Sequence, residues 1–584
     1  MRRQRPPVAL GLGLALVSPF VLQGSVSAQD AGLVYTDTAT GVVYQDLNQN
    51  NAQDAGELGV PDVSVSNGRE VVRTGRDGTY SLGVTDETIL FITKPPGYMV
   101  PVDEVQLPQF YYVHYPNGTP LELRYGGIEP TGPLPESVDF PLVEQDESGS
   151  FDALVFADPQ TRSLGELDDF RTDVVQELIG SDAALGLTVG DIVNDPLDLF
   201  GPHNEIVSEI GVPWWNLPGN HDMDYDAPDD TYATQTYKQV YGPTDYSTDY
   251  GQVHFVNMDN VDYFGQTADG RNGRYRGYLN PAQLEWLKND LAHVPADKLI
   301  MISTHIPLRT DAIGSTAVNT VNLEDLFEVL EGREHLYSVA GHDTSNSWQK
   351  YVGPEGGWNG AEPFLSQTLA EVRGGGWTTG PLDERGVQAA DMADGNPNGY
   401  YTITFEGNQQ VPRFKPASLP EDFQMRLSFQ GGRPSQTFLP SGPSGSDGIS
   451  PLPTFHPRDW GTEDVPEVTV NVFDGGERHQ VEARVDDGAF TPMAYDPPVK
   501  GLTGGDPNGN LDPYLTALRA ELAGTPEQPA RPEPSSHLWT AELPVGLQPG
   551  THTLTVRSTD PYGQVSETSQ DFQVVTGRPT SPRG

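Results

Sequence analysis

The sequence predicts a multidomain α+β protein in which a layered α/β domain lies between two β-sandwiches of immunoglobulin or prealbumin type. Three observations lead to this prediction. Residues 30–145 consist of short β-branched and aromatic runs separated by turn residues, and the same texture returns after residue 465. Residues 150–405 instead alternate apolar strands with amphipathic helices. A stretch near 430–465, rich in Pro, Gly and Ser, is typical of a linker or long loop.

The composition limits the classes of function. With 584 residues the chain is longer than one ordinary domain. It has no cysteine, which excludes thiolate chemistry. Its net charge is −48 and most of its 34 basic residues are arginine, a balance similar to that of proteins from salt-rich habitats. Nucleic acid is not an expected partner, because phosphate backbones bind to basic patches. The 9% of aromatic residues argues against a disordered acidic chain.

The N-terminus has the features of a secretory signal peptide. A basic segment is followed by an apolar run from Val8 to Leu22 and by a small-x-small site at 26–28. An uncleaved anchor is the alternative. No later stretch has the ~20 apolar residues of a membrane span. We therefore expect a secreted, periplasmic or cell-surface bacterial protein without a membrane span after cleavage.

Each region shows local signals for its elements. Asp77-Gly78 between EVVRTGR and TYSLGV predicts a hairpin. In the α/β region, Asn280 and Asn322 are placed to cap helices. The predicted boundaries are 1–28 for the signal peptide, 29–147 for the first β-sandwich, 148–408 for the α/β domain, 409–577 for the second β-sandwich with its linker, and 578–584 for a disordered tail.

Polar residues follow five apolar strands of the α/β region in succession. Divalent metal ions bind carboxylate, amide and imidazole ligands, and strand ends hold such ligands rigidly. One such signal is usually a loop or a core residue, but five in order argue against coincidence. The strand ends are ALVFADPQ with Asp158 and Gln160, GLTVGDIVND with Asp191, VPWWNLPGNHD with Asn220, His221 and Asp222, LIMISTHIP with His305, and HLYSVAGH with His342.

This ordered set resembles the calcineurin-like metallophosphoesterases, whose pattern is D-x-H, G-D, G-N-H-[DE], H and G-H-x-H. The resemblance covers about 150–405. The segments FYYVHYPNGTP, GGGWTTGPLDERG and MADGNPNGYY also resemble a secreted bacterial subgroup that carries a β-sandwich on each side. The resemblance implies a central four-layer α/β/β/α domain. It also implies a hydrolase that acts on phosphate mono- or diesters of a small molecule or phosphodiester substrate.

The resemblance further implies a centre of two divalent transition metals, Mn, Fe or Zn. Such ions make a hydroxide available for attack near neutral pH. Asp158 is then a ligand of the first metal and Asp191 bridges both ions. His221 is the general acid, steered by Asp222. The implied ligands of the second metal, besides Asp191, are Asn220, His305 and His342.

Two departures from the family pattern fall on the first metal. Gln160 stands where the family usually has histidine, and its neutral amide oxygen is a weaker ligand. Thr344 replaces the second histidine of the last motif. Asp343 is adjacent, but neighbouring side chains of an extended segment point to opposite faces. The first site is therefore expected to be weak. A single-metal phosphodiesterase and a non-catalytic surface or binding protein are the alternatives.

Substrate contacts have two candidates. Arg162 follows the first motif and Arg309 follows His305, and an arginine can bind phosphate through two hydrogen bonds. The alternative for each is a surface salt bridge. Four tryptophans near the motifs can stack on a substrate or pack in the core. They are Trp214, Trp215, Trp348 and Trp377.

A second metal motif lies in the first β-sandwich. The segment DLNQNNAQDAGE has the spacing of a calcium loop, except that Asn51 replaces the usual glycine at its sixth position. Asparagine tolerates a left-handed backbone there. The alternative is a polar turn without an ion. The candidate ligands of a structural calcium ion are Asp46, Asn48, Asn50, Asp54 and Glu57.

Overall fold

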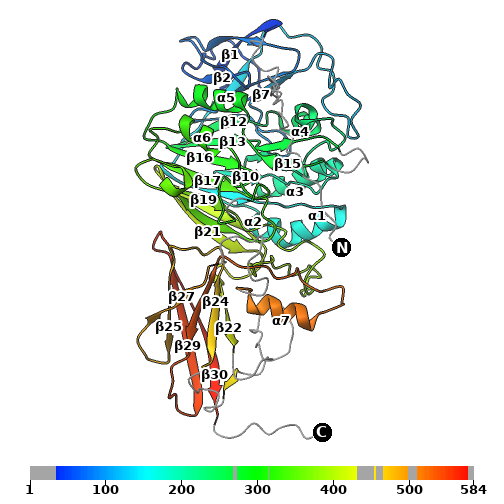
Figure 1. Cartoon of the computed structure of the whole chain (residues 1–584). Helices are drawn as coiled ribbons and strands as arrows, with labels where there is room; N and C mark the ends of the chain where they lie inside the picture. The colour runs from blue at the N-terminus through cyan, green and yellow to red at the C-terminus, as the bar shows by residue number, and fades with distance from the viewer. Residues whose placement is uncertain are drawn as a thin grey trace, which may run out of the picture.

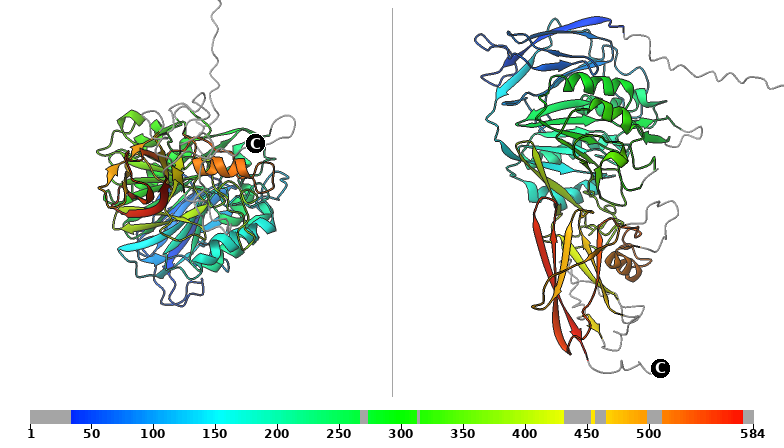
Figure 2. Two further views of the ribbon diagram at one scale, coloured as in Figure 1. Left: turned by 90° about the horizontal axis from the view of Figure 1, so that it is seen from below. Right: turned by 60° about the vertical axis from the view of Figure 1, so that its left-hand side comes forward.

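The computed structural model describes residues 34–266, 273–312, 315–430, 453–455, 465–497 and 510–575. The predicted signal peptide and C-terminal tail lie outside these residues, as does most of the predicted linker. Within the described part of the chain, no helix has the length and apolar character needed to cross a membrane. Three regions follow one another along the long axis of the molecule, with the N-terminal region at one end and the C-terminal region at the other (Figures 1 and 2).

The N-terminal region contains two four-stranded sheets, with strand orders β4-β1-β8-β6 and β3-β2-β5-β7. β1 and β8 are parallel, and the other pairs are antiparallel. The strands are β1 (Asp37–Gln45), β2 (Ser64–Ser66), β3 (Val71–Arg73), β4 (Thr79–Val84), β5 (Thr88–Ile92), β6 (Tyr98–Met99), β7 (Tyr111–His114) and β8 (Phe140–Glu144).

The hairpin predicted at Asp77-Gly78 is wrong. A tight turn is present, because Gly78 N donates to Gly75 O at 2.9 Å. However, β3 pairs with β2 and β4 pairs with β1, so the turn connects two different sheets. A two-residue turn signal specifies a local reversal of the chain, whereas the burial of each strand's apolar face decides its partner.

A five-stranded and a six-stranded sheet form the central region. The five-stranded sheet has the order β11-β10-β9-β20-β21, in which β9, β10 and β11 are parallel. Its strands are β9 (Ser150–Phe156), β10 (Leu185–Val189), β11 (Trp214–Leu217), β20 (Gly399–Glu406) and β21 (Gln409–Pro416). The six-stranded sheet has the order β12-β13-β16-β17-β19-β18, in which β13, β16, β17 and β19 are parallel.

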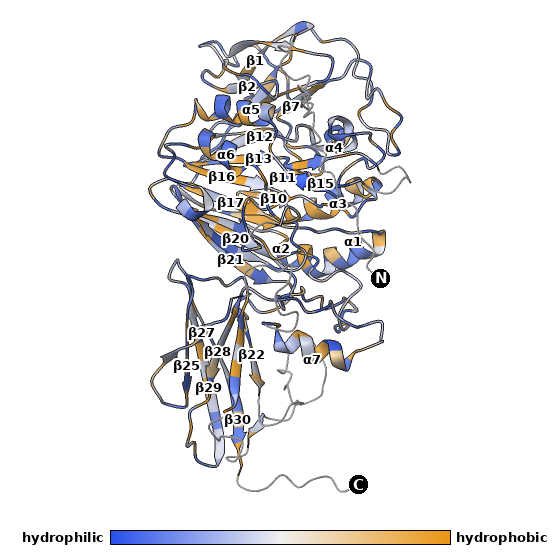
Figure 3. Ribbon diagram, in the orientation of Figure 1, coloured by the Kyte–Doolittle hydropathy of each residue, from blue (hydrophilic) through white to orange (hydrophobic). Residues whose placement is uncertain are grey.

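The remaining central strands are β12 (Tyr246–Tyr250), β13 (Val253–Met258), β16 (Leu299–Thr304), β17 (Leu336–Ala340), β18 (Trp348–Val352) and β19 (Phe364–Thr368), together with the separate pair β14 (Val261–Tyr263) and β15 (Tyr275–Gly277). All residues of β10 and β17 are buried, as expected for parallel strands covered on both faces. Figure 3 shows their apolar character.

Helices cover both central sheets. Phe156 of β9 packs with Phe170 and Phe200 from the helices beside the five-stranded sheet, whereas Leu287 and Leu326 belong to the cluster that contains the six-stranded sheet. The helices are α1 (Leu164–Phe170), its π-helical continuation (Arg171–Val175), α2 (Gln176–Leu178), α3 (Phe200–Val207), α4 (Gln235–Tyr241), α5 (Pro281–Leu291) and α6 (Leu323–Val329). The strand–helix alternation predicted from the sequence is confirmed.

The two predicted helix caps differ. Asn280 accepts hydrogen bonds from Ala282 N and Gln283 N, and the Gln283 side chain accepts one from Asn280 N. Asn322 precedes α6 but makes no such bond; its side chain instead bonds both backbone groups of Leu279. The capping role predicted for Asn322 is therefore wrong, because a tertiary contact occupies its amide.

The C-terminal region has a four-stranded sheet, β22-β24-β28-β27, and a five-stranded sheet, β23-β30-β29-β25-β26. Its strands are β22 (Met425–Gln430), β23 (Thr454–Phe455), β24 (Glu467–Val472), β25 (Gln480–Val485), β26 (Thr491–Pro492), β27 (Ala494–Tyr495), β28 (Leu538–Glu542), β29 (Gly550–Thr559) and β30 (Val565–Val574). Helix α7 (Pro513–Glu521) has no counterpart in the sequence prediction. β23 lies inside the stretch predicted as a linker.

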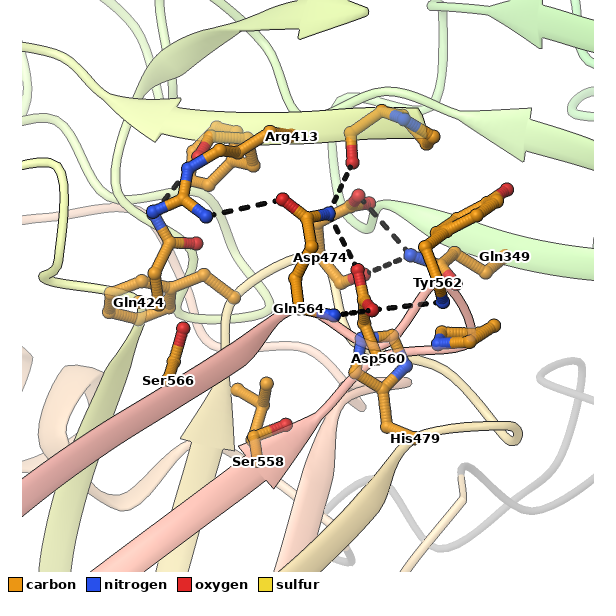
Figure 4. A pocket seen from close by; sticks show the side chains of 15 residues that line it. Gln349, Arg413, Gln424, Asp474, His479, Ser558, Asp560, Tyr562, Gln564 and Ser566 are labelled. Atoms are coloured by element: carbon orange, nitrogen blue, oxygen red, sulfur yellow. Dashed lines mark hydrogen bonds between the residues drawn. The ribbon is translucent and has the colours of Figure 1, made fainter. Parts of the chain in front are cut away.

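Both flanking regions pack against the centre. The N-terminal side combines apolar packing, with the ring centroids of Phe110 and Trp215 4.9 Å apart, and polar contacts, such as the hydrogen bond from Lys94 Nζ to Asp249 O at 2.7 Å. The C-terminal junction is polar and encloses a cavity of about 60 Å³ (Figure 4). There, Arg413 donates to Gln564 Oε1 at 3.2 Å, and Gln349 donates to Asp474 O at 2.5 Å. The junction thus depends on hydrogen bonds between the regions.

Candidate metal centre

The five strand-end signals meet at the carboxyl edge of the two central sheets. Asp158, Asp191 and Asn220 follow β9, β10 and β11, and His305 and His342 follow β16 and β17. Parallel neighbours end at the same edge, so each sheet places its polar residues side by side. All of them are at least nine-tenths buried except His342, which is half-buried. The residues predicted as ligands therefore lie at the carboxyl ends of strands in both central sheets.

Two histidine rings face each other at the centre. His305 Nδ1 lies 3.0 Å from the carbonyl oxygen of Val189, and His342 Nε2 lies 2.8 Å from that of Ala317. Each carbonyl requires a proton on the nitrogen that it contacts. In the neutral rings, the remaining nitrogens, His305 Nε2 and His342 Nδ1, carry lone pairs, and they lie 3.2 Å apart. This arrangement fixes both tautomers in the form that binds a metal ion.

Two side-chain oxygen atoms lie close to the facing histidine nitrogens. His305 Nε2 lies 3.1 Å from Asn220 Oδ1 and 3.2 Å from Asp191 Oδ1. Ligand atoms of Asp191, His305 and His342 all lie within 4.8 Å of one another. Four groups thus direct acceptor atoms at one volume, and the residues fit a divalent transition metal, which binds imidazole, carboxylate and amide oxygen.

The other half of the centre contains Asp158 and Gln160. The Asp158 carboxylate accepts a hydrogen bond from His342 N at 2.9 Å. The Gln160 amide nitrogen lies against the Asp191 carboxylate, and its oxygen accepts from Asn194 Nδ2 at 3.1 Å. Gln160 Oε1 is therefore turned toward Asn194 rather than presented as a ligand. Burial, followed by the charge of Glu371, raises the pKa of Asp158 well above its ordinary value.

The last motif does not replace its missing histidine. Thr344 is exposed. The Asp343 carboxylate points to the other side of the loop, where it accepts hydrogen bonds from Trp348 Nε1 at 2.7 Å and Ser345 N at 3.2 Å. As the opposite-face argument from the sequence predicts, Asp343 is not a ligand. In the folded site, neither residue 343 nor residue 344 directs a side chain to this half of the centre.

The backbone of the centre is strained. Five of its non-glycine residues have positive φ, between 42° and 77°. Such conformations cost roughly 1–3 kcal/mol each and cluster at functional sites. Their concentration on the loops after β9, β10 and β17 supports a functional centre independently of side-chain chemistry. The residues are Asp158, Gln160, Asp191, Asp195 and His342.

Two motif glycines allow the loops to approach. A Cβ on Gly219 would lie 2.2 Å from Asp191 Oδ1, and a Cβ on Gly341 would lie 2.1 Å from Asp158 Oδ2. Real Cβ atoms do not come this close, so any side chain at either position would displace a carboxylate of the centre. The glycines of G-N-H-D and G-H are therefore needed for space next to the ligands.

His221 is bonded to Asp195. Its Nδ1 lies 2.7 Å from Asp195 Oδ1, and its Nε2 lies 4.0 Å from Asp191 Oδ2. The steering role predicted for Asp222 is wrong. The Asp222 carboxylate is fully buried and accepts hydrogen bonds from the backbone N–H groups of Gly219, Ile192 and Val193, which fixes one loop to the other.

Charges at the centre favour a protonated His221. Burial lowers its pKa, but the charge of Asp191 and the hydrogen bond to Asp195 outweigh burial and raise the pKa above the ordinary value. Burial also opposes ionisation of Asp191, but the charges of His305 and His221 hold its pKa below the ordinary value. The carboxylate of Asp191 therefore favours the protonated form of the His221 imidazole.

The two arginines predicted to contact substrate are not held in the centre. Arg162 is exposed, and only its backbone N–H has a hydrogen-bond partner, Glu166, among the described residues. Arg309 Nε is buried without a partner, and its backbone bonds Ser366. All four tryptophans are at most 5% exposed and belong to the core rather than to a substrate surface.

Sequence reasoning missed several residues near the centre. Asp195 lies two residues beyond Val193 in the sequence, but its hydrogen bond with His221 depends on how the loop folds. Glu371 and Arg373 form an ion pair of 2.9 Å beside the Ala157–Pro159 turn. Tyr275 packs edge-on against His342, with ring centroids 5.8 Å apart. A glycine-rich loop after β19 gives no spacing signal that would have identified the ion pair.

The C-terminal region contacts the loop that follows His342. Ser536 Oγ donates to Ser347 O at 2.7 Å, and Ser536 N donates to Asn346 Oδ1 at 3.2 Å. From the central side, Asp394 accepts a hydrogen bond from Ser347 N at 2.9 Å. All four residues are buried. The loop that carries His342 is therefore fixed by both regions.

The predicted calcium loop is folded around its acidic residues. Asp46 and Glu57 are 2% and 8% exposed. Glu57 accepts hydrogen bonds from Leu47 N at 2.9 Å and Asp54 N at 2.8 Å, and Asp54 Oδ2 accepts from the Asn48 and Asn50 amides. Asn51 has a φ of 59°, the left-handed conformation expected for the glycine position.

Two family models match parts of the chain. The family model described as the N terminal of calcineurin-like phosphoesterase matches residues 47–125, and the one described as the C terminal matches residues 372–565. Both lie outside the segment with the strand-end motifs. A purple acid phosphatase from yellow lupin (Lupinus luteus) seeds aligns with 12% identity and a TM-score of 0.35, over 65% of this chain and 67% of that one. No curated protein matches.

Proposed function

The chain belongs to the calcineurin-like metallophosphoesterases, and from this premise we propose that it is a secreted enzyme that hydrolyses phosphate mono- or diesters. One observation carries the proposal. Acceptor atoms of four side chains converge on one volume, and the hydrogen bonds to Val189 and Ala317 leave the facing nitrogens free for a metal ion. The four residues are Asp191, Asn220, His305 and His342.

A divalent ion held by these residues would make a water molecule nucleophilic near neutral pH and neutralise charge on the phosphoryl oxygens. Asp191 and Asn220 orient this half from the five-stranded sheet, and His305 and His342 do so from the six-stranded sheet. The second-site ligands are thereby fixed on two rigid supports. We expect Mn²⁺, Fe²⁺ or Zn²⁺, because imidazole nitrogens are among the ligands.

His221 supplies the proton in this mechanism. Asp195 holds the Nδ1 side of the ring, so the other nitrogen, Nε2, faces the centre, 4.0 Å from Asp191. A protonated Nε2 donates to the leaving oxygen of the ester as the bond to phosphorus breaks, and Asp195 stabilises the imidazolium before transfer. Asp222 contributes by connecting the loops that carry Asp191 and His221.

A single-metal phosphodiesterase is the second candidate. Its support is the contrast between the complete second-site ligand set and the first site, where Gln160 Oε1 bonds Asn194 and Thr344 is exposed. Metal analysis of the full chain separates the two candidates. Two tightly bound transition-metal equivalents require the first site, and one equivalent supports the single-metal enzyme.

Hydrolysis of an aryl phosphate tests the proposed activity. p-Nitrophenyl phosphate and its bis ester are offered to the full chain with added Mn²⁺, Fe²⁺, Zn²⁺ or Co²⁺. His221→Ala is expected to lower kcat by about a hundred- to ten-thousandfold, the usual contribution of a positioned acid, and Asp195→Asn by less. No turnover of either ester with any of the four ions would refute the function.

Secretion is a proposal supported by the sequence of residues 1–28, which has a basic segment, an apolar run and a small-x-small site. The acidic composition supports an extracellular or salt-rich setting, because ions screen the repulsion among carboxylates. Mass spectrometry of the protein released by a bacterial host is the test. A mature N-terminus at Gln29 is expected, and retention of the full chain in the cytoplasm contradicts the proposal.

We further assign the paired sheets at both ends to β-sandwiches of immunoglobulin or prealbumin type, and the centre to a four-layer α/β/β/α arrangement. Calcium binding at Asp46–Glu57 is proposed on the folded loop and the conformation of Asn51. Added Ca²⁺ should raise the thermal transition of the wild type but not of Glu57→Gln. An equal response of both proteins would exclude this loop.

A further inference from the structure

Positive charge is scarce where the substrate must bind. Asp158, Asp191 and Asp195 surround the proposed phosphoryl position, and the whole chain carries −48. A phosphate ester therefore needs local cations in addition to the metal ion. The two arginines expected from the sequence do not fill this need, since Arg162 is exposed and the pKa of Arg309 is lowered by burial, with no carboxylate of the centre acting on it.

Arg373 lies on a segment that encloses the Asp158 turn. The N–H of the preceding residue, Val372, donates to Ala157 O at 2.8 Å. Four residues after Arg373, Trp377 Nε1 donates to Pro159 O at 2.7 Å. The chain is thus bonded to the residues on both sides of Asp158. This places Arg373 next to the weaker half of the metal centre.

The guanidinium of Arg373 is anchored on one side only. Its Nε donates to Glu371 Oε2 at 2.9 Å, and the Glu371 side chain is fully buried. The Arg373 side chain is 12% exposed. Among the residues that the structure describes, none accepts a hydrogen bond from Nη1 or Nη2. The outer edge of the guanidinium therefore has four N–H bonds available for a ligand.

We propose that Arg373 binds the phosphoryl oxygens of the substrate beside Asp158, with Glu371 holding its guanidinium in place. The inference rests on the proposed phosphoesterase function and adds a residue that the strand-end motifs do not contain. A planar guanidinium can offer two parallel N–H donors to a phosphate. A fixed orientation lowers the entropic cost of forming both hydrogen bonds.

Electrostatics agree with this placement. Burial disfavours the charged form of Arg373, but the charges of Glu371 and Asp158 outweigh burial and raise its pKa above the ordinary value. Asp191 acts on it in the same direction. The guanidinium is consequently within electrostatic reach of carboxylates from both halves of the centre. A phosphoryl group that bridges the halves would contact the metal ion on one side and Arg373 on the other.

Arg373 also supplies positive charge in the half of the centre that lacks two histidines of the family pattern. Gln160 and Thr344 stand where the family pattern has histidines, so the first site has fewer ligands to hold a metal ion. A buried cation supplies positive charge there without requiring a metal. The alternative is that Arg373 only forms a structural ion pair with Glu371. Substitution of Arg373 would then lower the stability of the protein and leave its phosphate affinity unchanged.

Phosphate affinity is the readout that separates these roles. Inorganic phosphate binding to the metal-loaded full chain is measured by calorimetry, together with phosphate inhibition, KM and kcat for p-nitrophenyl phosphate. Arg373→Gln is expected to weaken phosphate binding and raise KM by about ten- to a hundredfold, as for loss of a charged hydrogen bond. Metal content should be unchanged. Arg373→Lys should recover part of the loss, because it keeps the charge without the planar fork.

Arg385→Gln is the matched control, since Arg385 is also ion-paired on the same stretch of chain but bonds Asp173 and Asp383. It should keep wild-type phosphate affinity. If the Arg373 variants do not fold, hydrogen exchange of residues 371–377 in the wild type replaces them, with protection expected on adding phosphate. Unchanged phosphate affinity in Arg373→Gln, loss of metal instead of phosphate, or no protection would overturn the inference. Absence of ester hydrolysis by the wild type would refute the proposed function, while phosphate calorimetry would still test Arg373.

Discussion

Two buried clusters of histidine and aspartate in the central region have opposite hydrogen-bond patterns. At the carboxyl ends of the strands, His305 Nε2 and His342 Nδ1 face each other at 3.2 Å, next to the Asp191 carboxylate. Elsewhere, beneath the N-terminal region, His254 lies between two carboxylates, with Nδ1 2.9 Å from Asp249 and Nε2 2.7 Å from Asp290. The first cluster thus has two imidazole nitrogens facing each other, whereas in the second each imidazole nitrogen faces a carboxylate.

The difference shows how a metal site can be distinguished from a structural network. Around His254, Lys298 also bonds Asp249, and Ser247 donates to Asp290, so each carboxylate contacts at least two donors. Burial opposes the charge of His254, yet Asp290 and Asp249 raise its pKa to about 9. In contrast, burial and then the charge of His305 lower the pKa of His342 to about 3. Burial lowers the pKa of His305 as well, but the charge of Asp191 outweighs burial and raises it to about 10. The two facing nitrogens thus share one proton beside a carboxylate, at a position that a divalent cation can take.

The largest expected effect tests this distinction directly. His342→Ala removes one of the converging acceptors and should abolish tight metal binding at the second site. Activity should fall by at least about a thousandfold, because several kcal/mol of charge stabilisation are lost with the ion. Metal content by plasma mass spectrometry and kcat/KM for an aryl phosphate are the measurements.

His254→Gln is the matched control for this prediction. It replaces a more deeply buried histidine whose two ring nitrogens contact carboxylates, and it should keep the wild-type metal content. If both variants lost metal to the same extent, the contrast between the clusters would fail. If His342→Ala kept its metal, the second-site assignment would be incorrect.

A smaller effect is expected on the free energy of unfolding, from the cluster of His254, Asp249 and Asp290. The pKa of His254 is raised from 6.5 to about 9 in the folded protein, so its stabilisation is fully present below pH 6.5 and is lost as pH rises through 9. The shift corresponds to about 3 kcal/mol. Urea unfolding of the wild type should therefore show a decline of this size over that range, and His254→Gln should not.

His552→Gln provides the comparison for the pH experiment. His552 also pairs with a carboxylate, Asp486, but the pair is at the surface, where ion pairs contribute little. This variant should keep the wild-type decline with pH. A decline that persists undiminished in His254→Gln would assign the pH dependence to other groups and remove the proposed structural role of the cluster.

The sequence was sufficient for the parts of the centre that follow strands. Parallel strands of one sheet end at the same edge, so Asp158, Asp191 and Asn220 could be placed side by side, as could His305 and His342. One centre for both groups was implied by the family resemblance. The partner of His221 could not be chosen this way. Asp195 and Asp222 both lie near it in the chain, and only the left-handed turn at Asp195, with φ of 77°, directs that carboxylate to the ring.

Other failures have the same physical origin. Asp77-Gly78 specifies a turn, but the sheet that each flanking strand joins depends on burial against distant residues. Asn322 has the right type and position for a cap, but its amide is occupied by Leu279, which is 43 residues away. Arg373 follows no strand end directly. Local signals therefore predict elements and strand ends, whereas contacts between loops require the folded chain.

The smallest expected effect concerns the half of the centre that departs from the family pattern. Thr344→His together with Gln160→His would add two imidazoles beside Asp158, and the affinity for a second metal equivalent should increase at least about tenfold. Thr344→Leu with Gln160→Leu is the control without ligands. Titration of the metal-free protein with Mn²⁺ measures the change in affinity.

In the double-histidine variant, a metal ion would lie beside Arg373 and would also contact the phosphate. Phosphate binding should therefore depend less on the Arg373 guanidinium in this variant than in the wild type. If the double-histidine variant still bound one equivalent of Mn²⁺, the loop after His342 could not present residue 344 to the centre. The difference in metal binding between the two halves would then be caused by the backbone conformation of this loop rather than by Gln160 and Thr344.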